Sequence, residues 1–171
     1  KQTPYEGGIR TPIMFSWPNG DLKNGKRKDV VSSIDLFPTV LAATGARIPK
    51  NLPGLNLLEN LKNEKPIKRN GILGESFAHD IADVENPEES LLFRWTIEGK
   101  WKLLLTYDGE VNRYKTTHPR EEKRPQLFNL LQDPKEEKNL AKQNPKVVAR
   151  LADKIGKWWP VKERKVLTKW E

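Results

Sequence analysis

Hydrophobic positions are densest between residues 91 and 107, where their pattern predicts a β-hairpin. Aliphatic and aromatic residues fill 91–97 and 100–107, and Glu98-Gly99 between them has the composition of a tight turn. Two shorter apolar runs, one beginning at 71–74 and one at 126–131, predict further strands. These runs together indicate a small antiparallel sheet.

A single long helix is predicted after the last of these strands. Asn144 is a favourable N-cap, and Pro145 suits the first helical position. Apolar residues then recur at helical spacing, so one face of the helix should pack on the sheet. For Trp158 and Trp159 we favour packing roles over a platform for stacking sugars. The periodic positions are Val148, Leu151, Ile155 and Trp159.

The first third of the chain predicts a strand followed by a helix. Residues 13–15 are apolar and lie between prolines, which is typical of a short buried strand. A core helix should begin at Ser32 or Ser33, with Asp35 completing a capping box, and Gly45 should end it. Residues 46–70 and 83–90 have the composition of loops.

The composition of the chain excludes several kinds of chemical site, but it says little about the fold. The 171 residues contain no cysteine, which excludes disulfides, cysteine metal sites and a cysteine nucleophile within the chain. No apolar run approaches the length of a membrane span. The net charge of +8 favours anionic partners, although lysines on a solvated surface explain it more simply. Arg94 and Lys102 are expected to be such surface cations on the hairpin.

The first eighteen residues combine a cation, a glycine pair and a short apolar run. A glycine pair permits positive φ or a close backbone approach, and an ammonium group beside it is suited to an anion, although most such pairs only turn the chain. The pattern resembles the second signature region of the type I, formylglycine-dependent sulfatases. Its residues are Lys1-x-x-x-Tyr5-Glu6-Gly7-Gly8-x-Arg10-x-Pro12, followed by Ser16-Trp17-Pro18.

This resemblance continues in order along nearly the whole chain. It implies an α+β fragment, in which the end of an alkaline-phosphatase-like α/β domain precedes a small antiparallel sheet packed with a long C-terminal helix. Residues 1–60 would complete the catalytic domain, and residues 70–171 would form a smaller C-terminal subdomain with a basic tail. The further segments similar to family motifs are 33–39 with Gly45, 53–58, 99–103, 127–130 and 133–140.

The resemblance also implies a function, namely part of a sulfuric ester hydrolase that cleaves sulfate esters, of sulfated carbohydrates above all. In the family mechanism the hydrated aldehyde of formylglycine attacks sulfur, the alcohol leaves, and the sulfated enzyme then releases sulfate. Lys1 matches the family lysine that contacts the sulfate, so it is the candidate catalytic residue. The motif that yields formylglycine is missing here, and the chain looks like the C-terminal piece of a longer protein. We therefore expect the isolated chain to be inactive.

For the other candidate site residues, the sequence gives weaker predictions of their roles. Glu6 and Arg10 should pair and fix the turn at Gly7 and Gly8, a structural role at the border of the site. His79, next to an aspartate at a strand end, is a candidate contact for a sugar hydroxyl, and His118 is a weaker one. The remaining acidic candidates for a metal site, Asp80 and Asp83, are too scattered to predict one.

Cofactors, partners and location follow from the resemblance alone. It implies calcium for the full-length parent, with ligands that precede Lys1, so this chain should hold none. The expected partners are a sulfated small molecule or carbohydrate and the missing N-terminal catalytic portion. Family members are usually exported to the periplasm or the medium, or are lysosomal.

Two readings from other functional classes remain open. The basic charge suits a non-catalytic module that binds polyanions, either sulfated glycans or nucleic acid. Nucleic acid is the less favoured of the two, because the basic clusters lack interleaved aromatic residues. Alternatively, the chain is a purely structural subdomain, in which case it should expose apolar surface.

Overall fold

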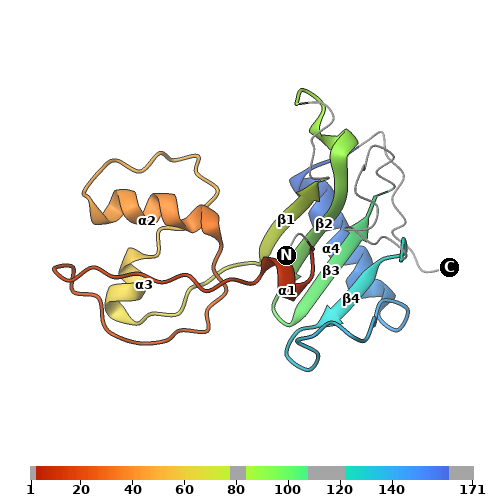
Figure 1. Ribbon diagram of the computed structural model, residues 1–171, viewed down its shortest axis with the longest axis horizontal. Coiled ribbons are helices and arrows are strands. Elements are labelled where there is room, and N and C mark those ends of the chain that lie inside the picture. Colours follow the sequence, from red (N-terminus) through yellow and green to blue (C-terminus); the bar gives the residue numbers. More distant parts are fainter. Residues whose placement is uncertain (1–2, 78–83, 108–121, 162–171) are drawn as a thin grey trace. The chain divides into compact units, whose positions relative to one another are not determined.

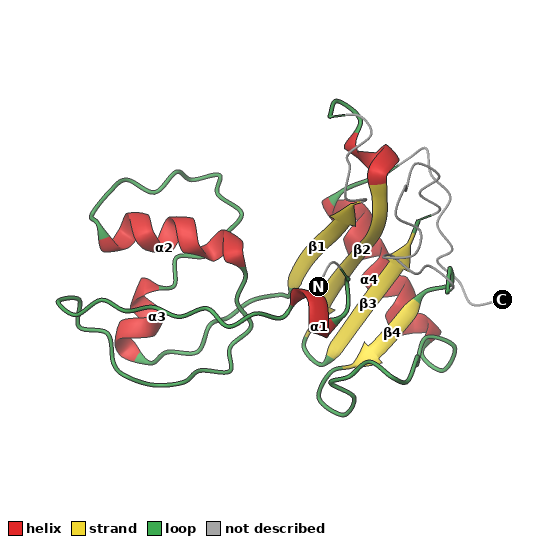
Figure 2. Cartoon of the chain, in the orientation of Figure 1, coloured by secondary structure: helices red, strands yellow, loops and turns green. Residues whose placement is uncertain are grey.

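The structure, a computed structural model, describes residues 3–77, 84–107 and 122–161 (Figures 1 and 2). The chain divides into two compact units. One comprises residues 11–72, and the other combines residues 1–10 with residues 73–171. The signature region at the start of the chain is therefore split, and its first ten residues belong to the C-terminal unit. The division expected from the resemblance, residues 1–60 and 70–171, stays a prediction for the full-length protein.

The C-terminal unit is built on a four-stranded sheet with the order β1-β2-β3-β4. β2 and β3 form the predicted hairpin, with Glu98 opposite Trp101, and β4 pairs antiparallel with β3. Gly99 turns the hairpin at φ +57°, a conformation that favours glycine. The predicted sheet is confirmed. Its strands are β1 (Ile72–Phe77), β2 (Leu91–Glu98), β3 (Trp101–Thr106) and β4 (Gln126–Asn129).

Helix α4 (Pro145–Trp158) covers one face of this sheet, as its periodicity predicts (Figure 2). Its buried residues Val148, Leu151 and Ile155 pack against leucines of the strands, and this cluster is the main core of the chain. A short 3-10 helix, Pro87–Ser90, precedes β2. The small antiparallel sheet with a long C-terminal helix confirms the α+β expectation.

Arg94 lies under the end of α4, so the prediction of a surface position is wrong. Only 4% of the residue is exposed. Its Nε donates to the Tyr107 hydroxyl at 2.5 Å, and its Nη1 donates to the Trp159 carbonyl. Arg94 lies on the face of the sheet that α4 covers, and its guanidinium stabilises carbonyls at the negative end of the helix.

Glu98 links the hairpin to α4 through ion pairs, and these pairs make the stability of the C-terminal unit depend on pH. Its carboxylate pairs with Lys154 at 2.6 Å and also with Arg150. The hydrogen bond from Lys154, and then that from Arg150, hold the pKa of Glu98 below its ordinary value of 4.5. Because the folded-state pKa is lowered, the stabilisation is complete above the unfolded pKa and is lost as the pH falls through the folded pKa.

We therefore expect Glu98→Gln to lower the free energy of unfolding by about 0.5–1 kcal/mol near neutral pH. The difference from wild type should vanish in acid, below the folded pKa. Urea unfolding of this unit at a series of pH values measures it. Asp153→Asn is the control, because Asp153 forms an exposed pair with Lys157 within α4 and should cost less at neutral pH. A Glu98 effect that persists unchanged at acidic pH would contradict this assignment.

The unit of residues 11–72 contains two helices, α2 (Leu36–Ala43) and α3 (Leu58–Asn63), and a 3-10 turn over Ser33–Asp35 leads into α2. The start of this helical region and its end at Gly45, where φ is +72°, agree with the sequence. The expectation that α2 is a core helix is wrong. Ile34, Phe37 and Val40 are 45–58% exposed.

The strand predicted at residues 13–15 is likewise absent from the structure. Residues 10–17 belong to no helix or strand, and Met14 is 88% exposed. A strand needs a neighbour to satisfy its backbone groups, and no described segment pairs with this one. This exposed apolar surface agrees with a structural piece of a larger protein.

Candidate functional site

Buried charged residues of the C-terminal unit meet around residues 3–9, the described part of the signature region within this unit, which we call the signature segment. Lys102, predicted to be a surface cation, is completely buried on the face of β3 opposite α4. Its Nζ lies 2.7 Å from Oε1 of Glu136 and 3.4 Å from Oε1 of Glu6. The prediction failed because residues 3–9 cover this face of the sheet. We call Glu6, Lys102 and Glu136 the ion cluster.

Glu136 links the ion cluster to the main chain of the signature segment. Its Oε2 accepts the Glu6 N–H at 2.5 Å. Its Oε1 forms an ion pair with Lys102, but the angles of this contact are not those of a hydrogen bond. The residue itself lies in the left-handed region at φ 58°. Asp133 shapes this loop by accepting the N–H groups of Glu137 and Lys138. These backbone donors hold the pKa of Asp133 below its ordinary value, so its carboxylate stays ionised near neutral pH.

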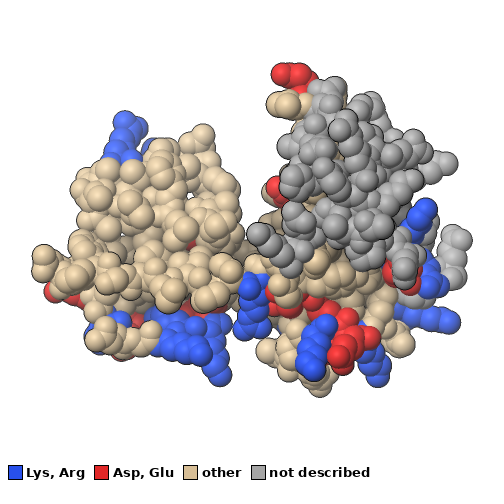
Figure 3. Space-filling view, viewed as in Figure 1, with Lys and Arg blue, Asp and Glu red and all other residues tan. Residues whose placement is uncertain are grey.

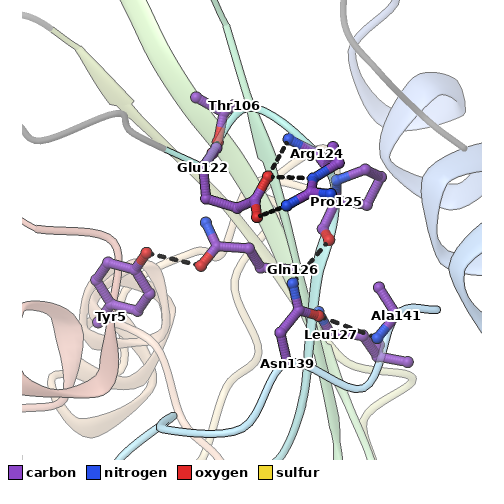
Figure 4. Close-up of polar contacts among 9 residues, drawn as sticks. All are labelled: Tyr5, Thr106, Glu122, Arg124, Pro125, Gln126, Leu127, Asn139 and Ala141. Carbon is purple, nitrogen blue, oxygen red and sulfur yellow. Dashed lines mark hydrogen bonds and ion pairs between the residues drawn. The ribbon is translucent and has the colours of Figure 1, made fainter. Parts of the chain in front are cut away.

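Tyr5 provides a second attachment beside the ion cluster (Figure 4). Its hydroxyl donates to Oε1 of Gln126 at 2.8 Å, and its ring packs edge-on against Phe128, with centroids 6.1 Å apart. Burial raises the pKa of Tyr5 despite the opposing effect of the Gln126 hydrogen bond. The phenol is therefore neutral at physiological pH and available as a donor.

The strand that carries Gln126 is itself held by Asn139 (Figure 4). The Asn139 Oδ1 accepts the N–H groups of Leu127 and Ala141, each at 3.0 Å, and its Nδ2 donates to the Pro125 carbonyl. Asn139 belongs to the same motif as Glu136, the Asp-Pro-x-Glu-x-x-Asn-Leu segment. One half of this motif therefore orders β4, and the other half supplies a carboxylate to the ion cluster.

An aromatic ring and a close backbone approach complete the surroundings of Lys102. Its ammonium lies 5.9 Å from the centroid of the Trp95 ring, a favourable cation–π arrangement. The Trp95 ring in turn lies against Gly74, where an added Cβ would be 2.3 Å from Trp95 Cζ2. These contacts and the two carboxylates offset the cost of removing the ammonium from water.

The described signature residues make some of the expected contacts and not others. Glu6 and Arg10 do pair, at 3.7 Å, but the Arg10 side chain is 73% exposed and the buried partner of Glu6 is Lys102. Gly8 requires glycine, because an added Cβ would lie 2.2 Å from the Thr3 carbonyl oxygen. Gly7 has open space around it, and neither glycine has positive φ.

The two residues predicted to meet the substrate, Lys1 and His79, lie outside the described residues, as do Asp80, Asp83 and His118. Their roles stay predictions. Sequence reasoning missed Lys102 and Glu136 as parts of the site. Both lie inside motifs that resemble the family, which was the available signal.

A second buried carboxylate organises the unit of residues 11–72. Asp35 is completely buried and accepts the N–H groups of Ser32 and Leu55 at 2.9 and 2.8 Å. Both of its oxygens lie 2.5 Å from Nη2 of Arg69. Gly54 permits this arrangement, because a Cβ there would lie 2.0 Å from the Ile34 carbonyl oxygen. This network ties the start of α2 to the loop before α3.

Neither a cluster of metal ligands nor a membrane-spanning helix is found among the described residues. Across 3–77, 84–107 and 122–161, no three His, Asp or Glu side chains gather as metal ligands would. Within the same ranges, no helix is long and apolar enough to cross a bilayer. These described residues offer no donor set for the calcium that the resemblance implies for the full-length parent.

Much of the basic charge is paired. In Figure 3, lysine and arginine side chains of the C-terminal unit alternate with acidic ones on the visible face. Ion pairs with carboxylates neutralise several cations, among them Lys102, Arg150 and Lys154. Because the net charge of +8 already subtracts these carboxylates, pairing leaves the overall excess of cations unchanged.

Comparison with known proteins identifies the family of the chain. Residues 1–159 match the family model described as N-sulphoglucosamine sulphohydrolase, C-terminal. An N-acetylgalactosamine-6-O-sulfatase of Bacteroides thetaiotaomicron is 29% identical across 90% of this chain and 28% of its own length. Arylsulfatase K of Mus musculus is 31% identical across 91% of this chain and 26% of its own length. The chain thus spans little more than a quarter of these relatives.

Solved structures agree with this match. A sulfatase structure from work on the metabolism of multiple glycosaminoglycans by Bacteroides thetaiotaomicron has a TM-score of 0.69 and 27% identity. The similarity covers 92% of this chain and 31% of that protein. The structural neighbours have the alkaline-phosphatase-like fold, of which this chain forms one part. The chain belongs to the N-sulphoglucosamine sulphohydrolase C-terminal family and is the C-terminal portion of a sulfatase.

Proposed function

We propose that the full-length protein containing this chain hydrolyses sulfate esters of sulfated carbohydrates. The match of residues 1–159 to the sulphohydrolase family carries this proposal. Two relatives support the substrate class, one named for N-acetylgalactosamine 6-O-sulfate chemistry and one studied for glycosaminoglycan metabolism. We further propose, from the family alone, that the protein is exported or lysosomal.

Within this reaction, the chain would supply binding and orientation. The Lys1 ammonium would hold the sulfate and balance its negative charge, which such groups do best when they are fixed in advance. His79 would contact the sugar, and the C-terminal unit would line part of the substrate pocket. The formylglycine nucleophile and the calcium ligands would come from the part of the protein before Lys1, so the isolated chain should be inactive.

Steady-state kinetics of the full-length protein on an aryl sulfate and a panel of 6-O-, 4-O- and N-sulfated sugars test this function. We expect turnover of at least one sulfated sugar, and Lys1→Ala should lower kcat/KM by about 100- to 1,000-fold. Lys157→Ala is the matched control, because the Lys157 side chain is 77% exposed on α4.

Absence of turnover on the whole panel, or a Lys1→Ala protein as active as wild type, would overturn the proposal. Turnover by the isolated 171-residue chain would show that the nucleophile lies within it. Retention of an inactive full-length protein on heparin at physiological salt, falling steeply as the salt concentration is raised further, would instead favour the polyanion-binding module.

A further inference from the structure

We infer that Lys102 and Glu136 are positioning residues for the proposed sulfatase reaction, and that they act by fixing the segment that carries Lys1. The inference rests on the proposed function, because it assigns these residues a role in that reaction. Neither residue would touch the substrate. Their effect would pass through Glu6, which both of them contact.

Tyr5 and Glu6 attach the start of the chain to the sheet through an ion pair and two hydrogen bonds. The Glu6 carboxylate faces Lys102 on β3, and the Glu6 N–H donates to the Glu136 carboxylate in the loop after β4. Tyr5 adds a hydrogen bond to Gln126 on β4. Three separate parts of the C-terminal unit therefore hold two consecutive residues.

Burial gives this attachment a defined geometry. Lys102 and the Glu136 side chain are 0% and 1% exposed, and the Glu6 side chain is 11% exposed. Low exposure limits replacement of these contacts by water, so the segment cannot shift without leaving a charge unpaired. A surface pair such as Glu6–Arg10 would not impose such a limit, because its arginine is 73% exposed.

The restraint on Tyr5 and Glu6 also limits where Lys1 can lie, because few residues separate them. Lys1 precedes Tyr5 by four residues, and each residue extends the chain by at most about 3.6 Å. Between them, the Thr3 hydroxyl accepts the Tyr5 N–H at 3.2 Å, and the Thr3 carbonyl lies against Gly8, so the lead into the turn is also shaped. Displacing a catalytic group by about 1 Å can lower the rate about 100-fold.

The test is a double-mutant cycle in the full-length protein. We expect Glu136→Ala to lower kcat/KM by about 10- to 100-fold. Glu136→Gln keeps an oxygen that can accept the Glu6 N–H, so it should lose less and remain folded if the alanine variant does not. Combined with Lys1→Ala, either substitution should have little further effect, because the group that it positions is already gone.

A purely structural role gives the opposite outcome. If Glu136→Ala or Glu136→Gln lowers kcat/KM by the same factor with and without Lys1, the inference is overturned. Lys154→Met is the matched control, because it removes an ion pair between α4 and the hairpin and should leave kcat/KM unchanged.

Hydrogen exchange separates this inference from the proposed function. In the full-length protein, Glu136→Ala should accelerate exchange of the amides of residues 5–9, while Lys154→Met should not. Unchanged exchange in Glu136→Ala would overturn the anchoring role even if the enzyme is active. An inactive wild type with accelerated exchange in Glu136→Ala would overturn the reaction and leave the anchoring of the segment supported.

Discussion

Lys102→Met should lower the free energy of unfolding of the C-terminal unit by about 3–5 kcal/mol, because it leaves two carboxylates without their buried cation. Methionine has a similar length and fits against Trp95, so little of the loss should come from a cavity. The measurement is native-state hydrogen exchange of β3 and β4 amides in the full-length protein, which reports the stability of this unit.

A second substitution distinguishes charge from packing. Adding Glu136→Gln to Lys102→Met should recover part of the lost stability, since it removes the most deeply buried uncompensated charge. If the two losses simply add, the ion cluster is not the cause. Lys154→Met should cost less than about 1 kcal/mol, because the Lys154 side chain is 26% exposed.

The elements that the sequence predicted correctly depend on local signals. The hairpin needed a dense apolar run and a turn with Gly99, and α4 needed an N-cap, a proline and helical spacing. The end of α2 at Gly45 is equally local, because a positive φ favours glycine there. Each of these signals lies within a few residues of the feature that it specifies.

The ion cluster could not be predicted in this way. Its partners are distant in sequence, with 96 positions separating Glu6 and Lys102. The run Lys102-Leu103-Leu104-Leu105 is nearly continuous in hydrophobicity, so alternation does not reveal that the lysine faces inward. Glu6, Lys102 and Glu136 lie in motifs that resemble one family, but nothing in those motifs predicts that their side chains meet.

The failed strand at residues 13–15 has a related cause. Its apolar composition was interpreted as a buried strand, but Met14 and Phe15 are exposed in the structure. Burial requires a partner, and none of the described segments supplies one.

Asp35→Ala should be as damaging to the other unit as Lys102→Met is to the first. It removes the acceptor of two backbone N–H groups and the ion-pair partner of Arg69, whose side chain is 10% exposed. The Nε of Arg69 already lacks a hydrogen-bond partner, so the unpaired guanidinium would have little compensation. We expect a loss of about 3–5 kcal/mol, measured by hydrogen exchange of α2 and α3 amides.

Removing the unpaired charge of Arg69 should separate the contribution of the ion pair to this loss of stability from that of the backbone hydrogen bonds. In the Asp35→Ala background, Arg69→Met removes the unpaired buried charge but leaves the N–H groups of Ser32 and Leu55 without their acceptor, so recovery should be incomplete. Glu64→Gln is the control, because Glu64 forms only an exposed pair with Lys23 and should cost less than about 0.5 kcal/mol. If Asp35→Ala costs no more than this control, Asp35 does not hold the start of α2 to the Leu55 segment. Full recovery with Arg69→Met would show that the ion pair matters and the backbone hydrogen bonds do not.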